Sequence, residues 1–160
     1  MSLKELLYLK LKALYDIETQ IVRALPMVVK KVSDINMKRA LSDHLKETRN
    51  QVLRLSKIFS LLKVRAAKTK VEAIRGLIKD TEWLMQNIKP RAALDAALLT
   101  SLQYVEHYEM AGYAGAREWA LLSGENIIAS ILEETLEEEK GANEKLSMIA
   151  DETVNKKISQ

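Results

Sequence analysis

The chain has 160 residues, a formal net charge of +3, no cysteine and only two histidines, His44 and His107. This composition excludes disulfides, cysteine-ligated zinc, iron–sulfur clusters and histidine-rich metal sites. The chain has five glycines and two prolines, which are too few for the many tight turns of a β-sandwich or barrel. The length fits one domain, no apolar run approaches the roughly 18 residues of a membrane span, and the first residues do not read as a signal peptide, so we expect an intracellular, cytoplasmic protein.

Apolar residues recur every three or four positions along nearly the whole chain, which predicts an all-α protein. The first helix begins after the N-cap residue Ser2 and keeps its apolar stripe beyond Pro26, so we expect the proline to kink this helix rather than end it. The next break comes at residues 33–34, where Asp34 offers an N-cap for a second helix whose apolar stripe spans residues 41–62.

The second half of the chain follows after a long connection. Residues 63–70 are basic and lose the helical period, which indicates a loop, and a shorter helix is predicted over residues 71–87. Pro90 disfavours helical angles at the residue before it and suits the first turn of a third long helix. Residues 122–125 then end that helix and cap the fourth.

The predicted elements amount to four helices of at least about 20 residues, each about 30 Å long or longer, and one shorter helix. The short helix lies within the connection between the second and third long helices, which makes that connection a long crossover. We therefore predict an all-α four-helix bundle with one long crossover over residues 1–155, followed by a frayed tail over residues 156–160.

Two glutamates stand in apolar stripes. Glu18 lies four residues after Leu14 on the first helix, and Glu109 lies four residues after Val105 on the third. A buried ionised carboxylate is costly unless it is paired, hydrogen-bonded or bound to a metal. Two such residues on two long helices of one bundle favour a joint explanation.

The other two long helices supply groups that can meet these glutamates. His44 and Glu47 are neighbours on one flank of the second helix, and on the fourth helix Glu139 lies in the stripe with Glu138 beside it. Glu47 follows Glu18 by 29 positions, and Glu138 follows Glu109 by 29, so the two halves read as a degenerate repeat.

One inward carboxylate per helix is the layout of a carboxylate-bridged dimetal site in a bundle, in which the carboxylate oxygens bridge two ions. Oxygen-rich ligand sets suit iron(II) and manganese(II). The predicted ligands are Glu18, His44, Glu47, Glu109, Glu138 and Glu139, with Glu106 as an additional candidate.

Four segments of the chain resemble the bacterial YciF-like family: residues 14–20, 44–48, 105–109 and 134–140. The Glu-His-Tyr-Glu run that ends at Glu109 is among the more specific of these pieces, and the resemblance extends over nearly the whole chain. It implies a ferritin-like bundle, related in architecture to rubrerythrin and commonly dimeric, in a group that is associated with stress responses and has no assigned activity.

The chain departs from the ferritin-like pattern of Glu-x-x-His on two helices. The corresponding segments read Glu47-x-x-Asn50 and Glu138-x-x-Gly141, so both histidines are missing. We therefore expect a metal-binding, stress-associated protein that holds iron or manganese and oxidises iron(II) weakly or not at all. The alternative is a non-catalytic structural or interaction dimer of the same fold, whose inward carboxylates form a hydrogen-bonded network.

The remaining features bear on partners. His107 lies opposite the apolar stripe and is expected to be a packing or interface residue. The basic stretch of residues 54–70 lacks interleaved aromatic residues, so we expect no nucleic-acid partner, and no membrane partner either. The short helix adds Trp83 and Leu84, and the third long helix adds Trp119 and Leu122 near its end. These apolar residues favour a homodimer, the commonest soluble assembly.

Overall fold

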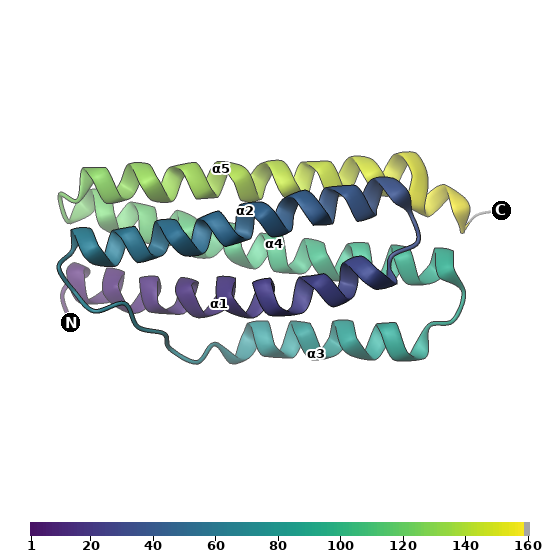
Figure 1. Ribbon diagram of the computed structural model, residues 1–160. Coiled ribbons are helices and arrows are strands. Elements are labelled where there is room, and N and C mark those ends of the chain that lie inside the picture. The colour runs from purple at the N-terminus through teal and green to yellow at the C-terminus, as the bar shows by residue number, and fades with distance from the viewer. Residues whose placement is uncertain (159–160) are drawn as a thin grey trace.

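The computed structural model describes residues 1–158 as helices joined by short connections and one long one (Figure 1). The α-helices are α1 (Leu3–Lys31), α2 (Ile35–Leu61), α3 (Glu72–Asn87), α4 (Arg91–Leu122) and α5 (Asn126–Ile149). A π-helical turn (Ala150–Val154) and a 3-10 turn (Asn155–Lys157) follow α5. No strand occurs among the described residues, which confirms the all-α prediction, and the tail expected over residues 156–160 lies in part outside them, at 159–160.

The starts of α1 and α2 follow the capping signals of the sequence, whereas α5, which residues 122–125 were expected to cap, has no side-chain hydrogen bond at its N-cap Glu125. The Glu5 backbone N–H donates to the Ser2 hydroxyl at 3.3 Å while the Glu5 carboxylate accepts from the Ser2 backbone N–H at 2.6 Å, which completes a capping box. The Asp34 carboxylate accepts from the first backbone N–H groups of α2 at 3.0 Å. Pro26 lies inside α1, which continues through it, as predicted.

Four of the helices form a closed ring. α1 packs against α2 and α4, and α5 packs against the same two helices. In Figure 1, α1 and α5 run in one direction and α2 and α4 in the other. Because α2 and α4 are parallel, their connection crosses the length of the bundle, and within it α3 packs against α4 and α1. The one-long-crossover bundle with a short extra helix is therefore confirmed.

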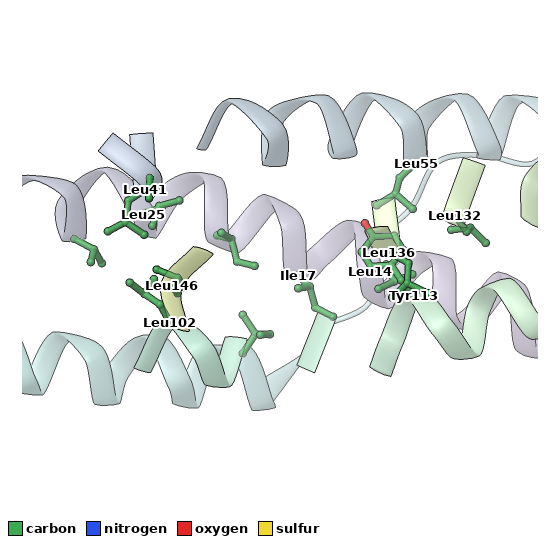
Figure 2. Close-up of a cluster of buried hydrophobic side chains, with 14 of the residues drawn as sticks. Leu14, Ile17, Leu25, Leu41, Leu55, Leu102, Tyr113, Leu132, Leu136 and Leu146 are labelled. Atoms are coloured by element: carbon green, nitrogen blue, oxygen red, sulfur yellow. The ribbon is translucent and has the colours of Figure 1, made fainter. Parts of the chain in front are cut away.

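The core is one apolar cluster that extends along the bundle, and a layer of polar side chains lies within it. Figure 2 shows Leu25, Leu41, Leu102 and Leu146 on one side of Ile17 and Leu14, Leu55, Leu132, Leu136 and Tyr113 on the other. Removal of each fully buried leucine from water contributes about 1.5–3 kcal/mol to the stability of the fold. No helix among the described residues combines the length and the hydropathy needed to cross a membrane.

Candidate metal centre

The polar layer is built from acidic side chains that the helices direct inward. Glu18 comes from α1, His44 from α2, Glu106 and Glu109 from α4 and Glu139 from α5, and none is more than 6% exposed. On each helix these residues lie at helical spacing from the buried leucines, so the same face that forms the apolar core also carries them. One ligand atom each of His44, Glu106, Glu109 and Glu139 lies within 4.8 Å of the others.

Several side chains in the layer are held by defined contacts. The His44 Nε2 lies 3.1 Å from Glu106 Oε1, and its Nδ1 lies 3.6 Å from Glu47 Oε2. The buried Tyr113 hydroxyl donates to Glu18 Oε1. The two carboxylates fix the orientation of the His44 ring, and the hydrogen bond from Tyr113 holds one of the two carboxylate oxygens of Glu18.

Several remaining oxygens of the layer have no hydrogen-bond donor when the glutamates are ionised. They are the Oε2 atoms of Glu18, Glu106 and Glu139, both carboxylate oxygens of Glu109 and the Oε1 of Gln51. Only a retained proton lets Glu18 bond to Glu109 and Glu106 bond to Glu139. Buried polar atoms in folded proteins are nearly always hydrogen-bonded, so a group of unpartnered acceptors at one place requires an explanation. Carboxylate oxygens with one imidazole are a donor set that iron(II) and manganese(II) accept, and these residues fit such an ion.

Burial also shifts the protonation of the layer. It raises the pKa of Glu18 to about 7, although the hydrogen bond from Tyr113 works in the opposite direction. Burial and the neighbouring carboxylates raise the pKa values of Glu109 and Glu139 well above the usual range. Burial alone would lower the pKa of His44, but the carboxylates of Glu106, Glu47 and Glu139 together outweigh burial and raise that pKa well above 6.5. Without a cation the layer therefore retains protons, and a bound cation would displace them.

The structure brings together five of the seven predicted ligands, Glu18, His44, Glu106, Glu109 and Glu139. Glu47 lies at the edge of the layer, with its side chain 45% exposed, and contacts His44 from outside. Glu138 lies beside the cluster rather than in it and is paired with Arg54, whose two guanidinium nitrogens donate to its carboxylate at 2.5 and 2.7 Å. Glu139 is thus the inward glutamate of α5.

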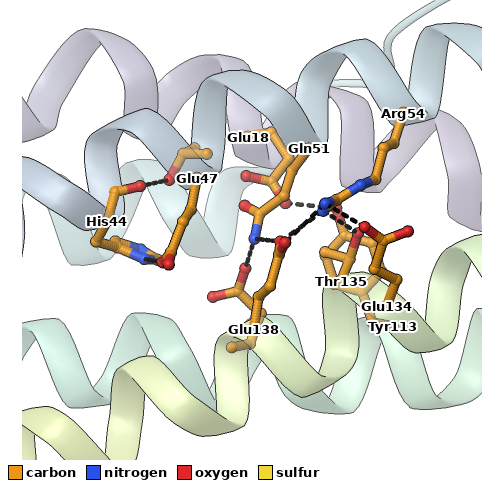
Figure 3. A network of polar contacts seen from close by, with 11 residues as sticks. Glu18, His44, Glu47, Gln51, Arg54, Tyr113, Glu134, Thr135 and Glu138 are labelled. Carbon is orange, nitrogen blue, oxygen red and sulfur yellow. Dashed lines mark hydrogen bonds and ion pairs between the residues drawn. The ribbon is translucent and has the colours of Figure 1, made fainter.

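Two residues that the sequence analysis did not single out complete the layer (Figure 3). Gln51 Nε2 donates to Glu139 and also to Glu138 at 3.0 Å. Arg54 reaches from α2 to both Glu138 and Glu134 of α5. Helical spacing could have identified Gln51, which lies seven residues after His44, whereas the role of Arg54 depends on which face of α5 it meets.

Asn50 and Gly141, which we expected at the two histidine positions of the ferritin-like motif, are both exposed, so neither faces the polar layer. The buried polar residues on α2 are His44, Thr48 and Gln51. Asn50 is one residue before Gln51 and is therefore turned from it by about 100° about the helix axis. His107 is exposed, outside the cluster.

Comparison with known proteins finds a family whose sequences match this chain. A family model described as a domain of unknown function, DUF892, matches residues 2–159. Protein YciF of Escherichia coli (strain K12) is 36% identical over 146 residues, which are 89% of this chain and 87% of YciF.

Solved structures have the same fold. The crystal structure of the E. coli stress protein YciF superposes with a TM-score of 0.93 at 31% identity, over 98% of this chain and 99% of that one. YcfI from Rhodopseudomonas palustris, described as a candidate structural protein, superposes with a TM-score of 0.91 at 35% identity, over 94% and 96% of the two chains. A protein from Xanthomonas campestris shares the fold, with a TM-score of 0.76 at 20% identity over 94% and 92% of the chains.

Proposed function

The chain belongs to the DUF892 family, and on that premise we propose that this YciF-like protein holds a single divalent metal ion, iron(II) or manganese(II), in the polar layer of its bundle. The observation that carries the proposal is the group of buried carboxylates in that layer, whose oxygens have no donor but one another's protons when no cation is bound. YciF of E. coli is named a stress protein, and we extend the stress association to this chain.

The proposed ligands are the four clustered residues, His44, Glu106, Glu109 and Glu139. Glu18 adds a further carboxylate, and its hydrogen bond from Tyr113 leaves Oε2 free to face the ion. Glu47 lies beside the His44 Nδ1, where a carboxylate commonly selects the tautomer of a ligating histidine. Three ionised glutamates and a neutral imidazole would hold a divalent cation with protons released to solvent.

The residues around the cluster support one ion rather than two. Arg54 already neutralises Glu138, and Gln51 donates its amide to both Glu138 and Glu139. α5 then offers one carboxylate to a metal, and α2 offers one imidazole. A bound iron(II) would supply one-electron redox chemistry, whereas ferritin-type oxidation uses two adjacent ions.

We therefore expect aerobic oxidation of iron(II) by this protein to be at most modestly faster than in buffer. The growth of iron(III) absorbance after mixing in a stopped-flow instrument measures this rate. Rapid oxidation, complete within the first seconds with two equivalents of iron per chain, would contradict the single-ion site.

Metal analysis and titration test the proposal directly. Protein purified without chelator should contain close to one equivalent of metal, and chelator-treated protein should bind one manganese(II) by calorimetry. Glu109→Gln should weaken that binding at least tenfold, while Glu137→Gln, at an exposed glutamate of α5, should leave it unchanged. An absence of binding for iron(II), manganese(II) and zinc in the wild-type chain would refute the proposal.

A non-catalytic structural role is the second candidate. It is favoured by the description of YcfI and by the hydrogen bonds that Tyr113 and Gln51 already make within the layer. In that case the polar layer would select the pairing of the helices rather than hold an ion. Glu109→Gln would then raise the stability of the chain, and added metal would leave the melting temperature unchanged.

A further inference from the structure

A pocket of about 170 Å³ lies between α2 and α5 and reaches the polar layer from solvent. Its lining includes His44 and Glu106, two of the four clustered residues. Its outer part is lined by Asp43, Glu47 and Lys145, whose side chains are half-exposed or exposed. The pocket therefore connects the buried cluster with the surface of the bundle.

Small residues keep this pocket open. Ala40 on α2 and Gly141 and Ala142 on α5 line it, where larger side chains would fill the space between the two helices. A Cβ atom placed on Gly141 would meet nothing within 4 Å. A volume of 170 Å³ equals that of about six water molecules at roughly 30 Å³ each, which is room for a cation with most of its hydration shell.

The charge of the pocket suits a cation. Four carboxylates line it, from Asp43, Glu47, Glu106 and Glu138, together with the ammonium group of Lys145 and the imidazole of His44. Arg54 neutralises Glu138 and Lys46 pairs with Asp43 at 2.9 Å, so Glu47 and Glu106 are the lining carboxylates that have His44 alone as an ion-pair partner. By contrast, the apolar pocket between α1, α3 and α4 contains none of the clustered residues.

We propose that the pocket between α2 and α5 is the access route by which a hydrated divalent cation enters the polar layer. Asp43 and Glu47 attract the cation at the rim, Lys145 opposes it, and Gly141 leaves the passage wide enough. This inference rests on the proposed function, because it names the path to that site. It also gives a role to Gly141, which is exposed and lines the pocket without belonging to the cluster.

The test measures how fast cobalt(II) enters the chelator-treated, full-length chain. Cobalt(II) absorbance in a stopped-flow instrument gives the association rate constant, and an equilibrium titration gives the dissociation constant. Gly141→Leu should slow association at least tenfold while the dissociation constant stays within about threefold, because a narrowed passage slows entry and exit alike. Gly76→Leu is the matched control, since Gly76 is also an exposed helical glycine with nothing within 4 Å of its Cβ position, and it should leave the rate unchanged.

A second pair of variants tests the charges of the rim without a change in packing. Lys145→Gln should speed cobalt(II) association at least twofold and Asp43→Asn should slow it by a similar factor, both at low ionic strength, and high salt should abolish the difference.

The two proposals fail in different ways. Association rates within twofold of wild type for Gly141→Leu would overturn the access route and leave the metal site standing. The same conclusion follows if Gly141→Leu weakens equilibrium binding without slowing entry. A wild-type chain that binds no cobalt(II), manganese(II) or iron(II) would instead refute the proposed function itself.

Discussion

Glu18 illustrates at the residue scale how far a buried carboxylate in this bundle departs from its behaviour in water. Its pKa is raised from 4.5 to about 7, chiefly by burial. A carboxyl group whose pKa rises on folding contributes stability below its unfolded pKa and loses that contribution as the pH rises through its folded pKa. The raised pKa values of Glu109, Glu139 and His44 act in the same direction.

We therefore expect the metal-free protein to become less stable as the pH rises from 5 to 8. The loss should be on the order of 2 kcal/mol of unfolding free energy, since each pKa unit corresponds to about 1.4 kcal/mol. Urea unfolding at several pH values measures it. Glu18→Gln, which keeps an acceptor for Tyr113, should give a shallower slope, and a stability that rises over this range in the wild type would contradict the protonation state inferred for the layer.

Arg54 is the other residue whose chemistry shapes the layer, because its guanidinium occupies the carboxylates that a second cation would need. Arg54→Met should lower the unfolding free energy of the metal-free chain by about 1 kcal/mol, which is the upper end of the range of stabilities that exposed ion pairs contribute. The freed Glu138 should then allow a second, weaker equivalent of manganese(II) to bind in calorimetry. Lys140→Met, which removes an exposed pair with Glu137, is the control, and a stoichiometry that remains at one would show that Arg54 does not limit the site.

At the scale of elements, the turn between α1 and α2 is held by a third helix. The buried Asp95 of α4 accepts hydrogen bonds from the Ser33 backbone N–H at 2.8 Å, the Ser33 hydroxyl at 2.5 Å and the Asp34 backbone N–H at 2.8 Å. Lys157, in the 3-10 turn after α5, lies 2.5 Å from the Asp34 carboxylate. One end of the bundle is thus joined by polar contacts between elements far apart in sequence.

Asp95→Ala should destabilise the protein by about 2–4 kcal/mol, because it leaves two backbone N–H groups of the turn without acceptors, each at a cost of about 1–3 kcal/mol. Denaturant unfolding at neutral pH measures the effect. Asp80→Ala, at an exposed position of α3, should change stability by less than about 0.5 kcal/mol. Equal effects of the two substitutions would show that Asp95 does not hold the turn.

At the scale of the whole molecule, large apolar side chains remain exposed outside the bundle core. Trp83 of α3 and Tyr104 of α4 are each 60% exposed and line one shallow pocket, and Leu122 at the end of α4 is 63% exposed. Leu84 and Trp119, which we also expected at an interface, are partly buried and pack against the core. The exposed aromatic pair makes the face of α3 and α4 the strongest candidate for contact between subunits.

We predict a homodimer, so light scattering at micromolar concentration should give twice the chain mass of 18.2 kDa. Trp83→Glu should shift the population toward the monomer by placing a charge in the interface. Leu53→Glu, at a similarly exposed position of α2, is the control and should leave the mass unchanged. A wild-type mass of one chain would refute the prediction.

Much of the fold could be predicted from local patterns. Ser2 and Asp34 begin helices because their side chains accept from backbone N–H groups a few residues away, and the stripe beyond Pro26 correctly predicted a continuous α1. Glu18 and Glu109 could be assigned to the interior because helical spacing places them among leucines whose burial was certain. The resemblance of several segments to the YciF-like family agrees with the DUF892 match over residues 2–159.

The tertiary structure decided what lies at the edges of those stripes. The side chains of Glu138 and Glu139 leave α5 in directions about 100° apart, so the rotation of α5 about its axis selects which of them faces the layer. Glu139 faces the layer, and Arg54 of α2 binds Glu138. Asp95 and Gln51 acquire their partners only when α4 meets the α1–α2 turn and α2 meets α5. By itself the sequence determined the helices, their caps and the inward carboxylates, because these depend on contacts within a few turns. The choice of ligands, the pairing of Arg54 and the opening at Gly141 depend on how separate helices pack.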